Sequence, residues 1–183
     1  TESLQRNSVN KAIKLVKSLK NEVYAFKIGH EFFYRFGLDG YKKIFKVSPR
    51  IFLDLKLHDI PNTVEKGLKA ILKLKPIFTT IHLSGGDNMQ KIASLVENSK
   101  TKILGVTILT SLNQKQTLKY FKEKNINNLV KKFAKFAKQN NLNGLVCSPH
   151  EIKVVRKEVG NKMTLVVPGI RLNNNIDKKD DQK

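Results

Sequence analysis

The sequence predicts an α/β protein built on a parallel sheet. Segments with apolar residues three and four positions apart alternate with short apolar runs, as expected when helices connect neighbouring parallel strands. Polar residues gather where the apolar runs end, and no G-x-G-x-x-G follows any of them, so a dinucleotide-binding fold has no support. Strand ends that converge on one site suit both a (β/α)8 barrel and an open doubly wound sheet. The periodicity alone does not choose between these two architectures.

The elements of the first half follow from the spacing of apolar residues. Val9, Ala12 and Val16 recur at helical spacing between lysines and predict the first helix. Gly37 and Gly40 predict a break inside the second helix. The expected helices are 7–20, 31–45 and 62–74, and the expected strands are 24–29, 51–57 and 78–83.

The second half continues the same alternation. The run K-I-L-G-V-T-I-L-T predicts a strand over 102–110. Leu129, Phe133 and Ala137 repeat between lysines and predict a helix over 128–139. The other expected elements are helices at 88–97, 114–121 and 149–159, strands at 144–147 and 164–167, and a polar loop at 173–183. Six strands are therefore expected in total.

The composition is that of one globular domain over residues 1–183. The hydrophobic content is 40%, which suffices for a real core at this length. No run approaches the ~18 apolar residues of a membrane span, and the first residues lack the pattern of a secretory signal. The one cysteine, Cys147, excludes an internal disulfide framework and fits a reducing compartment. We therefore expect a cytoplasmic protein with no membrane partner.

The strongly basic balance has two interpretations. A formal net charge of +20 is typical of a nucleic-acid-binding protein. The lysines, however, are spread through most of the expected helices, and asparagine is abundant as well. This distribution favours a solvated surface and no nucleic-acid partner. The alternative, a basic nucleic-acid-binding protein, predicts duplex binding that weakens steeply with salt. A positive field also favours encounter with an anionic phosphate substrate.

Three ionisable residues stand at the end of the apolar strand expected at 51–57: Asp54, Lys56 and Asp59. Side chains alternate faces along a strand, so Asp54 and Lys56 point the same way. Asp59 lies just past the strand end, before a helix opened by Pro61. Charges are rarely fully buried unless they are paired. The pattern indicates either a structural ion pair or a charged active site, and the spacing leaves both open.

The string D-L-K-L-H-D-I-P-N-T at 54–63 closely resembles the active-site segment of the orotidine 5'-phosphate decarboxylase family. Other segments resemble the family in the same order: K-I-G-H-E-F-F-Y-R-F-G, H-L-S-G-G, V-T-I-L-T-S, G-L-V-C-S, V-P-G-I-R and the pair D-Q at 181–182. The resemblance covers essentially the whole chain. It implies a (β/α)8 barrel, a homodimer, and cofactor-free decarboxylation of orotidine 5'-phosphate to UMP in de novo pyrimidine biosynthesis.

Two parts of the family barrel have no counterpart in the sequence. The family begins with a strand that ends in an A-L-D-like string, and no such strand is recognisable before the helix at 7–20. The family also continues past D-Q through a last strand and helix with a phosphate-binding loop. We therefore expect a barrel whose first strand and last strand–helix portion are absent from 1–183.

The resemblance assigns roles to the charged strand end. Asp54 is expected beside the departing carboxylate, and Lys56 is expected to protonate C6 of the pyrimidine. Asp59 resembles the residue that completes the charge array from the neighbouring subunit. Ile60 and Thr63 are expected to enter that subunit's site together with Asp59. These assignments imply two active sites shared across a homodimer.

Four further residues are expected to bind substrate. By resemblance, Lys27 contacts the ribose hydroxyls and the charge array, Thr110 faces the pyrimidine together with its neighbour Ser111, and Gln182 binds the phosphate. Arg171 is expected to line the opening of the barrel at which the phosphate binds. Taken alone, an arginine at this position is equally compatible with a surface salt bridge. A lysine at the position of Lys27 can also simply extend from a strand end into solvent.

The four histidines lack metal-site spacing, and no metal is expected. His58 lies inside the motif, and an orienting role is favoured because Lys56 already fills the place of the proton donor. A related barrel decarboxylase acting on a sugar phosphate, of the keto-gulonate-phosphate type, also carries D-x-K-x-x-D but uses magnesium. The I-P-N-T that follows Asp59 favours the orotidylate enzyme.

Overall fold

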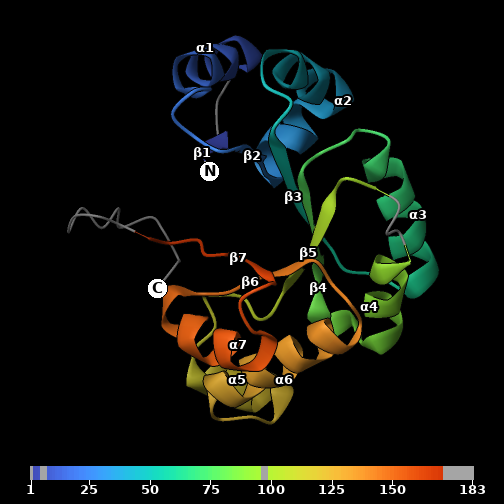
Figure 1. The fold of residues 1–183 in the computed structure, drawn as a ribbon, viewed down its shortest axis with the longest axis vertical. Coiled ribbons are helices and arrows are strands. Elements are labelled where there is room, and N and C mark those ends of the chain that lie inside the picture. Colours follow the sequence, from blue (N-terminus) through green and yellow to red (C-terminus); the bar gives the residue numbers. More distant parts are fainter. Residues whose placement is uncertain (1, 5–7, 96–98, 171–183) are drawn as a thin grey trace.

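The chain forms one parallel sheet whose strands lie side by side in the order in which they occur in the sequence. The fold is seen in a computed structural model that describes residues 2–4, 8–95 and 99–170. Within these residues the sheet has seven strands in the order β1-β2-β3-β4-β5-β6-β7, and each neighbouring pair is parallel. In Figure 1 the strands follow an arc with the helices on its outer side.

The sequential strand order decides between the two architectures that the periodicity left open. A doubly wound sheet contains a point where the strand order reverses, and no reversal occurs in the described sheet. Parallel strands that follow one another around an arc, each joined to the next through helices, are the arrangement of a (β/α)8 barrel. The predicted α/β barrel class is therefore confirmed.

The expectation that no strand precedes the first helix is wrong. Strand β1, Glu2–Leu4, pairs in parallel with β2, Phe26–Ile28, with Leu4 opposite Ile28. A three-residue strand with a single apolar side chain has no readable period, and this hid it in the sequence. The Leu4 side chain is fully buried, so this short strand contributes to the core, and the described sheet has seven strands where six were expected.

The remaining elements match the expected ones closely. The helices are α1 Val9–Leu19, α2 His30–Val47, α3 Pro61–Leu72, α4 Asp87–Ser94, α5 Gln114–Phe121, α6 Ile126–Gln139 and α7 Ile152–Val159, with short 3-10 turns η1 Leu83–Gly85 and η2 Pro149–Glu151. The strands after β2 are β3 Ile51–Leu57, β4 Phe78–His82, β5 Lys102–Val106, β6 Gly144–Val146 and β7 Thr164–Val166.

Strand β5 is shorter than the expected 102–110. Its partner β6 has three residues and pairs only as far as Val106 opposite Val146. The last contact at this end is a 3.3 Å hydrogen bond from the Thr107 N–H to the Val146 carbonyl. The apolar run continues to Leu109, but no neighbouring strand remains for it to pair with in this register. Thr110 therefore lies in a loop rather than at a strand end.

The predicted break in the second helix is confirmed at Gly37. Helix α2 runs over the expected region, but Gly37 has φ 56 and ψ −152, which is not helical. Positive φ is readily adopted only by glycine, so this residue permits the kink. On either side of it, Phe32 and Tyr41 are buried in the core.

The helices bury their apolar faces against the outer side of the sheet. One cluster lies under the first two helices and includes Val16, Phe26, Phe32, Tyr41 and Leu53. A second cluster lies under the later helices and includes Leu68, Ile81, Val130, Leu145 and Val155. This packing fixes the strands and hence the positions of the side chains at their carboxyl ends. Among the described helices, none is both long and apolar enough to cross a membrane.

Candidate active site

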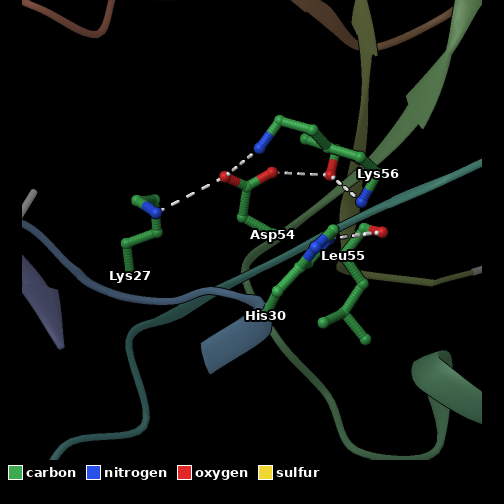
Figure 2. A network of polar contacts seen from close by, with 6 residues as sticks. Lys27, His30, Asp54, Leu55 and Lys56 are labelled. Atoms are coloured by element: carbon green, nitrogen blue, oxygen red, sulfur yellow. Dashed lines mark hydrogen bonds and ion pairs between the residues drawn. The ribbon is translucent and has the colours of Figure 1, made fainter. Parts of the chain in front are cut away.

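Three charged side chains meet at the carboxyl ends of β2 and β3. The Lys56 ammonium lies 2.7 Å from Asp54 Oδ2, and the Lys27 ammonium lies 3.5 Å from the same oxygen. Figure 2 shows both ammonium groups directed at this one carboxylate. Asp54 and Lys56 come from β3 and Lys27 comes from its neighbour β2. The expectation that Asp54 and Lys56 share one side of the sheet is confirmed by this distance.

Asp54 is a buried carboxylate that stays ionised. Only 6% of the residue is exposed. Burial alone would raise the pKa of its carboxyl group, but the charge and hydrogen bond of Lys56, the charge of Lys27 and a hydrogen bond from Thr80 together hold that pKa below its ordinary value. One anion between two cations therefore persists at neutral pH. The Lys27 and Lys56 side chains are 28% and 32% exposed and line a cavity beside the strand ends.

The backbone of β3 is irregular at the site. The pairing of β3 with β4 runs from Leu53 opposite Thr79 to Leu57 opposite Ile81, with a register shift between them. Lys56 itself has φ 44, in the left-handed region that favours glycine. Bulges of this kind are common next to active sites, where they redirect a side chain. Here the bulge presents the Lys56 side chain to Asp54.

Thr80 on β4 joins these two residues and was missed in the sequence. Its hydroxyl donates a 2.9 Å hydrogen bond to Asp54 Oδ1 and accepts one of 2.9 Å from the Lys56 N–H. Thr80 is fully buried. A threonine within F-T-T-I-H fits an ordinary strand, so the only available signal was a polar residue near the carboxyl end of an apolar strand.

The charged cluster opens onto a small cavity. A space of about 160 Å³ is lined by Lys27, Asp54 and Lys56 together with Leu4, Gly29 and His30. His30 Nε2–H donates a 3.0 Å hydrogen bond to the Leu55 carbonyl (Figure 2). The cavity thus combines a fixed anion with two cations in partial shelter from water, where charge interactions are stronger than in bulk.

The other residues expected from the motif lie outside this cavity. Asp59, Ile60 and Thr63 are exposed, in the loop after β3 and the first turn of α3. Asp59 Oδ1 accepts a 2.6 Å hydrogen bond from the Ile60 N–H. Ile60 is a large apolar side chain with 66% of its surface exposed. These three residues do not contribute to the cavity within their own chain.

Those of the remaining expected residues that the structure describes do not line the cavity of the charged cluster. Thr110 is half-buried and lines a different cavity of about 320 Å³, together with residues such as Asn113, Ser148 and Glu151. Arg171 and Gln182 lie outside the described residues. The structure therefore brings together Lys27, Asp54 and Lys56, and places Thr110 in a separate hollow.

Two histidines stand beside the charged cluster. The His58 and His82 rings lie 5.2 Å apart, tilted by 37°. Burial, followed by the charges of His58 and Lys56, lowers the pKa of His82 to about 4, so His82 is neutral at pH 7. Within the described residues, no group of three or more histidine, cysteine, aspartate or glutamate side chains is arranged to hold a metal ion.

Fold and site together define an α/β-barrel protein with a lysine–carboxylate–lysine cluster at its strand ends. A sequence model described as the Orotidine 5'-phosphate decarboxylase / HUMPS family matches residues 3–183. The chain belongs to this family.

Curated relatives share substantial identity with the chain. The chain is 40% identical over 182 residues to the orotidine 5'-phosphate decarboxylase of Wolbachia pipientis subsp. Culex pipiens (strain wPip), covering 99% of this chain and 79% of that protein. It is 44% identical over 161 residues to the orotidine 5'-phosphate decarboxylase of Gluconobacter oxydans (strain 621H), covering 84% of this chain and 68% of that protein.

Solved structures share the fold. Orotidine 5'-phosphate decarboxylase from Lactobacillus acidophilus superposes with a TM-score of 0.78 at 36% identity, covering 92% of this chain and 80% of that chain. An uncharacterized conserved protein from Geobacillus kaustophilus superposes with a TM-score of 0.82 at 25% identity, covering 91% of this chain and 81% of that chain.

Proposed function

We propose that the protein decarboxylates orotidine 5'-phosphate to UMP, as a step of de novo pyrimidine biosynthesis. Family membership supports the reaction, because the relatives described above are named orotidine 5'-phosphate decarboxylase and this chain covers most of their length. The observation that carries the proposal is the ion pair of Lys56 with buried, ionised Asp54 at the mouth of a cavity. Such a pair offers what loss of carbon dioxide needs: an anion beside the leaving carboxylate and a proton donor beside the carbon left behind.

The Asp54 charge favours departure of the carboxylate. A substrate carboxylate bound next to an ionised, buried Asp54 is repelled, and the repulsion is relieved as neutral carbon dioxide forms. Because two ammonium groups hold the pKa of Asp54 down, the residue keeps its charge when a second anion approaches. The same two cations attract the anionic substrate to the site.

Lys56 supplies the proton. As the bond from C6 to the carboxylate breaks, its electron pair remains on C6 and carbon dioxide leaves. An ammonium proton of Lys56 then bonds to C6, and solvent returns a proton to the neutral amine. An ammonium that is already oriented by its 2.7 Å contact with Asp54 stabilises the developing negative charge without reorganisation.

The substrate contacts extend beyond the charged cluster. In the proposed complex, Lys27 contacts the ribose hydroxyls, Thr110 faces the pyrimidine, Gln182 binds the phosphate and Arg171 lines the same opening of the barrel. Asp59, with Ile60 and Thr63, completes the site of a second subunit in a homodimer. The exposure of all three residues in their own chain supports this last assignment, because residues that serve a partner's site must reach the surface.

We also propose a cytoplasmic enzyme that needs no metal and has no nucleic-acid partner. The single cysteine of the sequence, Cys147, is a free, buried thiol and fits a reducing compartment. Binding to duplex DNA that falls steeply with salt would contradict the nucleic-acid part of this proposal.

The direct test is conversion of orotidine 5'-phosphate to UMP, followed by absorbance and by chromatography of the product, with and without a metal chelator. We expect turnover that is unaffected by chelation. Lys56→Ala is expected to lower kcat by about 10²–10³ or more while the far-ultraviolet circular dichroism stays unchanged. Lys69→Ala is the matched control, because Lys69 pairs with Glu65 on the surface of α3 and surface pairs contribute little.

Two results would contradict the proposal. Near-normal turnover by Lys56→Ala would exclude the proton-donor role. A strict requirement for magnesium, with turnover of a sugar phosphate in place of orotidine 5'-phosphate, would assign the chain to the related barrel decarboxylases instead.

Shared sites are tested by mixing two inactive variants. In a 1:1 mixture of Lys56→Ala and Asp59→Ala subunits, half of the dimers are hybrids with one intact site, so about a quarter of the wild-type activity should return if each site spans a two-fold interface. Absence of rescue after subunit exchange has been verified would show that Asp59 acts within its own chain or not at all.

A further inference from the structure

The peptide group between Leu55 and Lys56 is held by side chains on both sides. The Leu55 carbonyl accepts a 3.0 Å hydrogen bond from His30, and the Lys56 N–H donates a 2.9 Å hydrogen bond to the Thr80 hydroxyl. Figure 2 shows the His30–Leu55 contact beneath the carboxylate of Asp54. A single peptide unit, placed directly before the side chain proposed to deliver the proton, is thus fixed by two residues from other elements.

Thr80 lies opposite the irregular part of β3. From Leu53 to Leu57 the strand advances four residues, while β4 advances only two, from Thr79 to Ile81. The extra length includes Lys56 with its unfavourable φ of 44. A backbone in this region persists where surrounding contacts hold it, and the Thr80 hydroxyl supplies one such contact.

The same hydroxyl also orients the carboxylate. Its proton is donated to Asp54 Oδ1 at 2.9 Å, and the Lys56 ammonium binds the other oxygen, Oδ2, at 2.7 Å. The hydroxyl can accept and donate at once, so Thr80 couples the carboxylate position to the backbone position of Lys56. The hydrogen bond to the carboxylate also helps to lower the pKa of Asp54.

We infer that Thr80 is the positioning residue of this site: its hydroxyl sets the distance and angle between the Asp54 carboxylate and the Lys56 ammonium. The expected effect on kcat rests on the proposed function. The structural role of Thr80 does not depend on that function. Thr80 does not line the charged cavity, so it acts through Asp54 and Lys56 rather than on the substrate.

The neighbouring threonine provides a matched control. Thr79 and Thr80 are both fully buried on β4, but the Thr79 hydroxyl has no hydrogen-bond partner among the residues that the structure describes. Thr→Val replaces a hydroxyl by a methyl group of similar size. At Thr79 this change removes no described hydrogen bond, whereas at Thr80 it removes both the donor to Asp54 and the acceptor for Lys56.

The kinetic test compares Thr80→Val, Thr80→Ser and Thr79→Val. For Thr80→Val we expect kcat to fall by about 10- to 100-fold, because misplacing a reactive group by about 1 Å can cost that much, while KM changes much less. Thr80→Ser keeps the hydroxyl and should retain most of the activity, and Thr79→Val should match the wild type. Equal kcat for Thr80→Val and Thr79→Val would overturn the inference.

A titration of Asp54 separates this inference from the proposed function. With carbon-13 label in the aspartate carboxyl groups, the pKa of Asp54 should rise in Thr80→Val, since a hydrogen bond to the ionised form is lost, and should stay unchanged in Thr79→Val. If Thr80→Val does not fold, Thr80→Ala is titrated in its place. This measurement needs no substrate: an unchanged pKa refutes the positioning role even in an active enzyme, and a raised pKa supports it even if orotidine 5'-phosphate is not converted.

Discussion

Two buried carboxylates lie near the carboxyl ends of strands, and their surroundings differ in kind. Asp54 on β3 and Glu151 after β6 are 6% and 5% exposed, and each lines a cavity. Asp54 binds two ammonium groups and a hydroxyl. Glu151 accepts a 2.9 Å hydrogen bond from the Ser148 N–H and completes a capping box at the start of η2.

The difference shows that burial of a carboxylate does not by itself mark a reactive site. Glu151 satisfies backbone donors at a helix start, which is a structural task for an acidic residue. Asp54 holds side-chain cations that are partly exposed to the cavity, and these are groups that a substrate can reach. The identity and accessibility of the partner therefore separate the two roles.

The largest expected effect comes from removing the Asp54 charge. Asp54→Asn keeps the shape of the side chain but leaves Lys27 and Lys56 without their shared anion. We expect kcat to fall by about 10²–10³, the size typical of losing one preorganised electrostatic group, in a protein that still folds. Steady-state kinetics measure this, and turnover within a few-fold of wild type would remove the contrast with Glu151.

Glu151→Ala should instead affect stability. Loss of the cap leaves the Ser148 N–H without its buried acceptor, and we expect the free energy of unfolding to fall by about 1–2 kcal/mol. kcat should stay within about two-fold of wild type. Urea unfolding measures the loss, and Glu151→Gln, which keeps an acceptor oxygen, should recover part of it. A large drop in kcat for Glu151→Gln with unchanged stability would make Glu151 functional after all.

The free energy of unfolding should depend on pH in two ranges, one determined by His82 and the other by Asp54. The pKa of His82 falls from 6.5 to about 4, so the unfolded state binds more protons and stability is lost as pH falls between these values. The pKa of Asp54 lies below 3.8, so its contribution is present above 3.8 and is lost as pH falls further. Urea unfolding at several pH values measures both.

Each pH range has its own control. His82→Gln should flatten the loss between pH 6.5 and about 4, and Asp54→Asn should flatten the loss below pH 3.8. If both variants retain the wild-type profile, the acid sensitivity arises elsewhere in the chain.

The smallest effect is expected at Thr110, which lines the same cavity as Glu151. If Thr110 binds the pyrimidine as proposed, Thr110→Val removes one neutral hydrogen bond, a contact of about 0.5–1.5 kcal/mol. We expect KM to rise by roughly two- to ten-fold with little change in kcat. An unchanged KM, measured beside Thr117→Val on α5 as control, would exclude Thr110 from substrate binding.

Much of the fold could be predicted because local signals were strong. Strand β3 occurs where the sequence predicted it, because its apolar run is bounded by Pro49 and Pro61. Helix α6 ends at the predicted residue 139, because Leu129, Phe133 and Ala137 recur at helical spacing. The end of β5 could not be predicted, because it depends on the length of β6, a partner about 40 residues later. Strand pairing, rather than composition, determines where β5 ends.

The candidate site was predicted in part for a similar reason. Asp54 and Lys56 are two residues apart, so strand alternation predicts them on one side of the sheet, whereas the left-handed backbone and register shift that direct Lys56 toward Asp54 have no signal in the sequence. Thr80 lies 24 residues from Lys56 and 26 from Asp54, and its partners become visible only when β3 and β4 are paired with their register shift. Thr110 lies past the last paired residue of β5, and the apolar run gave no sign that the strand ends before it.

The φ of 44 at Lys56 has a consequence for engineering. Glycine adopts this backbone at lower cost than lysine, but it would leave the buried Asp54 carboxylate without its 2.7 Å partner, and loss of one partner of a buried ion pair is costly. The backbone conformation and the ion pair therefore place opposite demands on residue 56. Engineering of this scaffold for heat resistance should leave Lys56 in place and seek stabilising substitutions away from the strand ends.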